Sequence, residues 1–406
     1  MGIFKTIIKG DRVIWTIYLI ILTISMLEVF SASSSLTNSL HEYWRPFVRH
    51  FMFLMIGTAV VIAIQFVPPK FFRTIPVLFI PIAAILLIVT PFLGVKANEA
   101  TRWLSIGGVQ FQPSELAKLA VITTIALLLS RMKDDKESIN RTFKIILIIT
   151  FMFCGLILPE NFSTAGMLGM ISFIMMFIGR IPIIKLAITT SIIGGVLAIL
   201  LFVLAPVIPR DTPLLGRLPT WTERLSNHSE GITPETDLKI VFNDDNYQVS
   251  HSKIAIATGG IFGKFLGNSQ ERDFLPQAYS DFIYAIIIEE TGLIGGTFVL
   301  ALYLILMFRA GILARRCSRS FYAFLLMGAT LVIVLQALIN MGVAVSLLPV
   351  TGQPLPLISR GGTSTIMTCV YFGIILSISR TTSKDEIGEE EKEVVPPGVK
   401  LVNEKI

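Results

Sequence analysis

The stretch FLPQAYSDFIYAIIIEETG, residues 274 to 292, decides the fold of this chain. It joins an apolar run of membrane-helix character to three carboxylates, Asp281, Glu289 and Glu290. A charge inside a bilayer is costly unless it faces protein or a water-filled cavity. The stretch therefore predicts a membrane helix inside a bundle, with Asp281 at its outer mouth and the two glutamates further in, bonding to neighbouring helices.

Composition extends this prediction to the whole chain. Of its 406 residues, 53% are hydrophobic and 15% are charged, and the mean hydropathy is +0.73, which excludes an ordinary soluble domain. Because about twenty apolar residues cross a bilayer core, we predict an all-α polytopic membrane protein with one large extracytoplasmic loop between helices 7 and 8. Its ten transmembrane helices are expected at about residues 13–30, 50–67, 74–93, 113–130, 142–159, 163–179, 185–206, 277–308, 320–345 and 362–379.

Lysine and arginine give the orientation. One set of short connections carries sixteen of these residues and the opposite set carries five. Because the connections rich in them stay in the cytoplasm, both termini are expected there and Asp281 is expected on the outer face. The prediction divides the chain into a ten-helix membrane domain, residues 1–380 with the outer loop at 207–276, and a cytoplasmic tail, residues 381–406, expected to be disordered.

Other bulk features exclude several classes of function. The three cysteines lie in predicted spans or a cytoplasmic connection, so no disulfide framework is expected. No His and Cys spacing typical of a metal site occurs, so no metal ligand is assigned, although a divalent cation stays open as a cofactor. The net charge of +6 follows from the basic cytoplasmic connections, and no nucleic acid is expected as a partner.

Two further segments bring polar residues to the outer face. In TRWLSIGGVQFQPSELAK, residues 101 to 118, Pro113 suits the first turn of a helix and Glu115 suits the positive end of the helix dipole. Lys118 follows on the same face. Either Lys118 snorkels toward the interface, or it forms a cationic site with Arg102 and Glu115. Its stem is long enough that we expect an ion pair with Asp281 in the empty site.

The second segment is LLPVTGQPLPLISRGGTS, residues 347 to 364. Proline and glycine at this density end helices, so an irregular outer loop is expected between the ninth and tenth spans. Such backbone at membrane depth must be buried in protein or line a wet cavity. A tight loop without any ligand satisfies the same pattern.

Together, three blocks of this sequence resemble the signature blocks of the FtsW/RodA/SpoVE (SEDS) family, the lipid II glycosyltransferases of bacterial cell-wall synthesis. The blocks are RWLSIGGVQFQPSELAK, GGIFGKFLGNSQERDFLPQAYSDFIYAIIIEETG and LLPVTGQPLPLISRGGTS, and the resemblance covers about residues 10 to 380. It implies that Asp281 is the catalytic base. It also implies a lipid-substrate site formed by Arg102, Glu115, Lys118, Ser359, Gly361 and Gly362.

Two places depart from the family pattern. Tyr279 and Ser280 stand where the family has His-Thr, and Arg360 stands where it has an aromatic residue. The sequence also carries features of two branches of the family. The run GNSxxRxFLP resembles the division branch, FtsW, whereas LPVTGQPLP resembles the elongation branch, RodA. Division is the preferred interpretation, and an elongation-type polymerase is the alternative.

The resemblance also implies a location and partners. The location is the bacterial cytoplasmic (inner) membrane, crossed many times. The substrate is lipid II, an undecaprenyl-diphosphate-linked disaccharide peptide. Other partners are a class B penicillin-binding protein transpeptidase, further divisome proteins and membrane lipid.

A mechanism can be argued from the residues themselves. No phosphate loop of the G-x-x-x-x-G-K-[ST] type occurs, and no nucleotide pool exists outside the membrane, so the donor must arrive activated. A lipid-linked diphosphate sugar fits this need. Its leaving diphosphate could be neutralised by one of six cationic residues: Arg102, Lys118, Arg210, Arg217, Arg224 or Arg360. Asp281 would then deprotonate the acceptor hydroxyl in an inverting displacement.

Three alternatives stay open. Asp281 could merely cap the helix that follows it. A transporter that flips lipid-linked precursors would also need polar groups between helices, although a carboxylate at one face, rather than at the midplane, favours chemistry there. The third alternative is a non-catalytic scaffold for division proteins.

Overall fold

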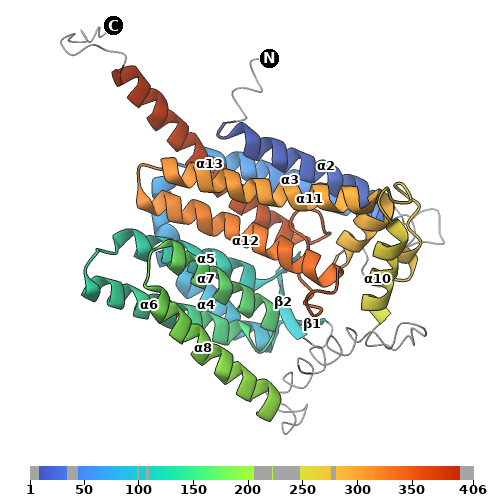
Figure 1. The fold of residues 1–406 in the computed structure, drawn as a ribbon, viewed down its shortest axis with the longest axis horizontal. Helices are drawn as coiled ribbons and strands as arrows, with labels where there is room; N and C mark the ends of the chain where they lie inside the picture. Colours follow the sequence, from blue (N-terminus) through green and yellow to red (C-terminus); the bar gives the residue numbers. More distant parts are fainter. Residues whose placement is uncertain are drawn as a thin grey trace.

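The computed structural model describes residues 9–33, 44–97, 100–106, 109–204, 222, 247–275 and 280–393. It is a bundle of long helices with a small sheet at one end (Figure 1). The helices that correspond to the predicted spans are α2 (Arg12–Ser33), α3 (Trp44–Phe66), α4 (Ile75–Leu93), α5 (Pro113–Arg131), α6 (Lys136–Ile157), α7 (Phe162–Ile178), α8 (Ile183–Ile199), α11 (Ile283–Arg316), α12 (Ser320–Ala344) and α13 (Thr363–Glu393).

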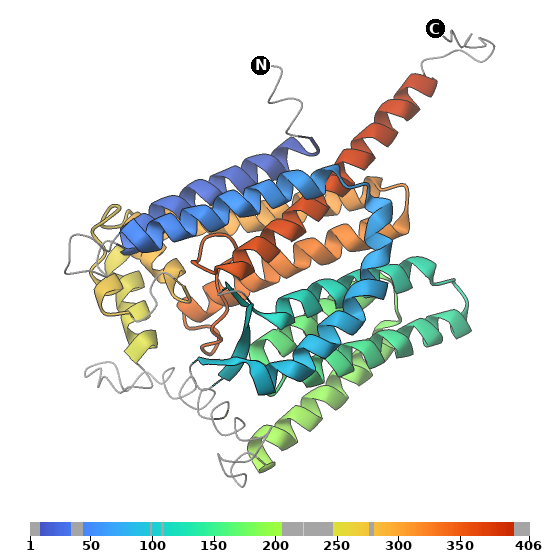
Figure 2. The ribbon, with the colours of Figure 1, turned by 180° about the vertical axis from the view of Figure 1, so that it is seen from behind.

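The predicted all-α polytopic membrane fold is confirmed, whereas the large extracytoplasmic loop between helices 7 and 8 stays a prediction. In the described part of the chain, nine helices are long and apolar enough to cross a membrane, and α7 is a shorter apolar helix of 17 residues. Helix α2 begins and α13 ends at the same end of the bundle, whereas α10 (Tyr247–Gly259) lies at the opposite end (Figures 1 and 2). An even number of crossings requires this arrangement. Which end faces the cytoplasm stays a prediction.

Polar residues just before the helices set several helix starts. The side chain of Asp135 accepts a hydrogen bond from Ser138 N at 2.8 Å and so caps α6. Asn161 caps α7 in the same way through Thr164 N, at 3.1 Å. Pro113 occupies the first turn of α5, as its sequence predicts.

The centre of the bundle is formed by α5 and α13. In each, 78% of the apolar window is buried in protein, against 6% for α8, whose side chains are left to lipid. Helix α13 packs closely on α3 through glycines. A Cβ at Gly57 would lie 2.5 Å from Cys369 Sγ, and one at Gly373 would lie 2.7 Å from Ile64 Cβ. Small residues let membrane helices approach to this distance.

Helix α11 is not the single continuous span that the sequence predicts. Gly292 has φ 72° and ψ −176°, which breaks the helix into a short piece before it and a long piece after it. The freed backbone groups bond to the segment after α10: Leu293 N donates to Gly260 O at 3.0 Å, and Lys264 N donates to Glu289 O at 2.9 Å. A broken helix is tolerated in a membrane when its backbone is satisfied in this way. Glu289 and Glu290 therefore end a short separate helix and do not continue a straight span.

A three-stranded antiparallel sheet, which we did not predict, precedes α5. Its strands are β1 (Val95–Ala97), β2 (Ala100–Ile106) and β3 (Val109–Phe111), in the order β1-β2-β3. Leu104 pairs with Phe111 across β2 and β3. Because successive side chains of a strand point to opposite faces, this sheet sends Arg102 and Trp103 in different directions.

The two predicted non-helical regions are described only in part. Within the outer loop at 207–276, the structure describes residue 222, α10 and residues 260–275, which include the short helix η4 (Glu271–Asp273). Arg210, Arg217 and Arg224 lie outside the described residues. Helix α13 continues to Glu393, so the domain boundary predicted at residue 380 falls within a helix, and residues 394–406 lie outside the described part.

Candidate functional site

The irregular loop between α12 and α13, residues 345–362, lies at the centre of the site. It is folded into the protein: Leu355, Ile358 and Ser359 are at most 1% exposed. Two side chains of α12 hold its backbone. Gln336 Nε2 donates to Pro354 O at 3.0 Å, and Asn340 Nδ2 donates to Gln353 O at 2.8 Å. The part of the loop around Leu355–Ser359 is therefore buried, and α12 satisfies two of the neighbouring backbone carbonyls, as irregular backbone in a membrane requires.

Asp281 lies against this loop, directly before α11. Asn340 Nδ2 donates to Asp281 O at 2.8 Å, and Ser280 Oγ donates to the carboxylate atom Oδ1 at 3.0 Å. Ser359 Oγ donates to Ser280 O at 2.5 Å. The N-cap residue of α11 is Phe282, so Asp281 is not the cap of this helix. Its backbone is fixed, and the residue as a whole is partly exposed.

Arg102 of β2 faces the same space as Asp281. A Cβ placed on Gly352 would lie 3.6 Å from Asp281 Oδ2 and 3.9 Å from Arg102 Nη1. Gly352 has φ 66°, a backbone conformation that glycine adopts without strain. Arg102 Nε donates to Glu160 O at 2.7 Å, which orients the guanidinium. The structure thus brings together a carboxylate and a guanidinium over a position that has no side chain.

Glu115 and Lys118 lie deeper, on α5. Lys118 is fully buried, so it does not snorkel. Its Nζ lies 2.8 Å from Glu115 Oε1 and 3.3 Å from Gln336 Oε1. The expected ion pair between Lys118 and Asp281 is wrong, because the nearer carboxylate of Glu115 takes the ammonium. Through Gln336, which also bonds the loop, this buried pair supports the backbone next to Asp281.

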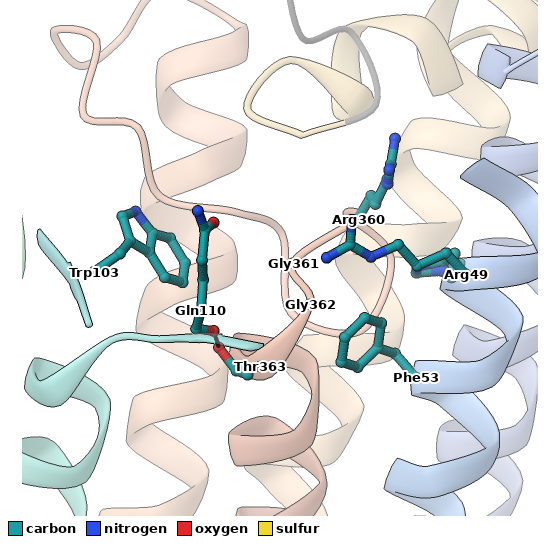
Figure 3. Close-up of a pocket in the computed structure, with 9 residues that line it drawn as sticks. Arg49, Phe53, Trp103, Gln110, Arg360, Gly361, Gly362 and Thr363 are labelled. Carbon is teal, nitrogen blue, oxygen red and sulfur yellow. Dashed lines mark hydrogen bonds between the residues drawn. The ribbon is translucent and has the colours of Figure 1, made fainter. Parts of the chain in front are cut away.

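Gly361 and Gly362 line a cavity of about 220 Å³ beside the loop. Figure 3 shows it between the start of α13, the sheet and α3. Thr363 Oγ1 donates to Gln110 O at 2.8 Å and so ties α13 to β3 (Figure 3). Ser359, by contrast, uses its hydroxyl inside the protein, because it also accepts from Leu355 N at 2.7 Å.

Glu289 joins the short helix of α11 to residues 264–271. It is fully buried, and its carboxylate accepts from Lys264 Nζ at 2.7 Å, Ser269 Oγ at 2.5 Å and Gln270 N at 3.1 Å. Glu290 accepts from Ser31 Oγ of α2. These contacts agree with the predicted structural role of the two glutamates. Their predicted position within a straight membrane helix is wrong, because they lie at the end of the short helix that precedes Gly292.

The sequence did not single out several residues of the site. Gln336 and Asn340 are polar side chains four residues apart in the apolar helix α12, so they lie on the same helix face. This spacing of polar residues could have indicated that they contribute to the site. Arg49 and His50, at the start of the second predicted span, also line the cavity. Among the described residues, no group of three or more His, Cys, Asp or Glu side chains could hold a metal ion.

Comparisons with known proteins agree with this architecture. A protein of Coxiella burnetii named probable peptidoglycan glycosyltransferase FtsW is 29% identical over 389 residues, which cover 92% of this chain and 99% of that protein. A Bacillus subtilis protein of the same name is 31% identical over 397 residues, which cover 95% and 94%.

Solved structures share the fold. A chain from a study of structural coordination of polymerization and crosslinking by a peptidoglycan synthase complex superposes with a TM-score of 0.71 at 22% identity, over 93% of this chain and 99% of that one. The Thermus thermophilus rod shape determining protein RodA gives a TM-score of 0.63 at 21% identity, over 92% and 97%.

The family model described as cell cycle protein, FtsW/RodA/SpoVE, matches residues 11–384. Because this match spans the whole helical bundle, the chain belongs to the FtsW/RodA/SpoVE family of cell cycle proteins.

Proposed function

We propose that this chain is a peptidoglycan glycosyltransferase that polymerises lipid II into glycan strands on the outer face of the bacterial cytoplasmic membrane, with Asp281 as general base. The observation that carries the proposal is the shared space over Gly352, which Asp281 Oδ2 and Arg102 Nη1 both face. The activity named for the curated relatives supports the same reaction.

A carboxylate and a guanidinium in one space suit glycosyl transfer from a lipid diphosphate. Asp281 takes the proton of the acceptor hydroxyl as its oxygen attacks the anomeric carbon of the donor. The bond from that carbon to the diphosphate breaks, and the leaving oxygen keeps the electron pair. Arg102 is positioned to neutralise this developing charge. A single displacement of this kind inverts the anomeric carbon.

Glu115 and Lys118 have a supporting role in this mechanism. Their charges neutralise each other 2.8 Å apart in the interior. A buried pair of this kind is costly to break. It therefore fixes Gln336 and the loop under Asp281, while Gly352 leaves the space in which substrate can bind.

Division is the process that we assign to this activity. The Coxiella burnetii and Bacillus subtilis relatives carry the FtsW name, and the GNSxxRxFLP run fits that branch. In this assignment both termini lie in the cytoplasm, and the end of the helical bundle that contains Asp281 faces the outside of the membrane. The peptidoglycan synthase complex among the structural neighbours supports a class B penicillin-binding protein transpeptidase as partner.

The test is polymerisation of purified lipid II by the full chain in proteoliposomes, read as glycan length on gels. Wild type should polymerise, and Asp281→Asn should lose about 10²- to 10⁴-fold in rate because the amide cannot accept the proton. Asp273→Asn is the matched control, since this carboxylate is 54% exposed. Transfer of a fluorescent lipid II across the vesicle membrane without any polymer would overturn the proposal in favour of a transporter.

A further inference from the structure

Asn340, on α12, is joined to both sides of the space between Asp281 and Gly352. Its Nδ2 donates to Asp281 O and to Gln353 O, each at 2.8 Å, and the residue is 1% exposed. Gln353 directly follows Gly352, the glycine whose Cβ position lies 3.6 Å from Asp281 Oδ2. One side-chain amide therefore connects the backbone of the carboxylate residue to the backbone on the other side of this space.

The orientation of this amide is determined by its two partners. Both are backbone carbonyl oxygens, which can only accept a hydrogen bond, so the nitrogen of Asn340 and not its oxygen must face them. Both N–H groups are then used, and they diverge from one nitrogen at a fixed angle. The positions of the two carbonyls relative to each other are therefore set by a short side chain.

The carbonyl of Asp281 lies outside the hydrogen bonding of helix α11. In a helix that continued back to this residue, Ala285 N would donate to Asp281 O, but it donates to Phe282 O at 3.0 Å instead. The bond from Asn340 satisfies a carbonyl that the helix leaves open. It therefore holds the backbone of Asp281 at a point where α11 does not.

Gln336 provides a comparison within the same helix. It lies one turn before Asn340 on the same face of α12, and its Nε2 donates to Pro354 O at 3.0 Å. Its Oε1 accepts from Lys118 Nζ at 3.3 Å. In the described structure Gln336 thus bonds the loop and not Asp281, whereas Asn340 bonds both.

We propose that Asn340 is a positioning residue for the transfer step, which sets the distance between the Asp281 carboxylate and the space over Gly352. The proposal rests on the proposed function, because that function makes Asp281 the general base. Asn340 acts through Asp281 and not on the substrate, since its remaining polar atom, Oδ1, is buried. Misplacement of a reacting group by about 1 Å can cost about 10²-fold in rate, so one amide at this place can control the reaction.

The experiment measures kcat and KM for lipid II polymerisation by the full chain in proteoliposomes. Asn340→Leu keeps nearly the shape of asparagine and removes both N–H groups. It should lower kcat about 10²-fold and leave KM within about twofold of wild type, because the groups that bind substrate are unchanged. Asn340→Ser is the second variant, in case leucine disturbs folding. Its single hydroxyl proton can bond at most one of the two carbonyls, so kcat should fall about tenfold.

Two further variants of α12 are the controls, and melting temperatures are measured on the same preparations. Gln336→Met removes the bond to Pro354 O and should lower kcat less than Asn340→Leu does, even at an equal loss of melting temperature. Thr330→Val replaces a buried hydroxyl that donates to Leu326 O within the helix, at 2.9 Å, and should keep the wild-type kcat. Equal losses of kcat in Gln336→Met and Asn340→Leu would reduce Asn340 to general support of the loop and overturn the proposal.

A double-mutant cycle separates positioning from a purely structural role. If Asn340 acts through Asp281, adding Asn340→Leu to Asp281→Asn should cost almost no further rate. Losses that multiply, or a wild-type kcat in both Asn340 variants while Asp281→Asn is inactive, would overturn the positioning role alone. Full polymerisation by Asp281→Asn would instead overturn the proposed function, and the role of Asn340 with it.

Discussion

Lys118 Nζ lies 2.8 Å from Glu115 Oε1, in the interior of the bundle and one helix away from Asp281. Lys118 is fully buried, and the Glu115 side chain is 8% exposed. Because Lys118 also bonds Gln336, which holds Pro354 O, the pair connects α5 to the loop beside Asp281.

We expect single replacements of this pair to destabilise the protein. Lys118→Met and Glu115→Gln should each lower the free energy of unfolding by about 3–5 kcal/mol, because each leaves a buried partner uncompensated. The double variant should lose less than the sum. Thermal unfolding in detergent measures this, with Lys136→Met, at an exposed position, as the control. Losses that simply add would show that the two residues act independently.

Gly352 offers a test of the space between Asp281 and Arg102. Gly352→Ala would place a methyl group 3.6 Å from Asp281 Oδ2, at a backbone φ of 66° that alanine adopts at a cost. Gly352→Val adds bulk in the same space. We expect the rate of polymerisation to fall about tenfold with alanine and further with valine, as substrate positioning is lost. Gly194→Ala on α8, where nothing lies within 4 Å of the new Cβ, should keep the wild-type rate. An unchanged rate in Gly352→Val would exclude this space as the reaction site.

The orientation in the membrane can be tested by thiol labelling. In a background without Cys154, Cys317 and Cys369, single cysteines replace Asn268 and Asp134, which are both exposed. An impermeant thiol reagent added to intact cells should label the cysteine at 268 and should reach the one at 134 only after lysis. Labelling of both from outside would contradict the predicted topology and the outer position of Asp281.

Hydropathy was sufficient to predict where the long apolar helices lie. A run of about twenty apolar residues has few alternatives in a bilayer, so a helix is found at each of the ten predicted positions, nine of them long enough to span in the described part of the chain. The break in α11 was not predictable in the same way. Gly292 follows Glu289, Glu290 and Thr291 within a span that the sequence predicts to be continuous, and its positive φ depends on contacts with the distant loop at 259–264.

For the candidate site as well, the sequence identified individual residues but not the contacts between them. The sequence singled out Asp281, Arg102 and the glycine-rich last loop, because charged residues and helix breakers stand out in an apolar chain. The sequence did not identify the correct partner of Lys118. Distances estimated from helical rise alone suggested an ion pair with Asp281, but Glu115 lies one turn away on the same helix and forms the pair instead.

The loop after α10 carries the last prediction. A Cβ at Gly263 would overlap the backbone carbonyl of Glu290, and Gly263 has φ 77°. Gly267 has a similar φ of 88°, but nothing lies within 4 Å of its Cβ position. Both alanine variants therefore carry the cost of a left-handed backbone, about 1–2 kcal/mol. Only Gly263→Ala also pushes the loop away from the break in α11.

Gly263→Ala should therefore unfold at a clearly lower temperature than Gly267→Ala, and the difference isolates the contact between the loop and α11. It should also lower polymerisation more than Gly267→Ala does, because the short helix that begins after Asp281 is held at its far end by Lys264 and Glu289. Thermal unfolding and glycan synthesis are measured on the same preparations. Equal melting temperatures for the two variants would mean that the loop does not stabilise the broken helix. A lower melting temperature of Gly263→Ala with unchanged polymerisation would instead show that the loop stabilises the protein but does not determine the position of Asp281.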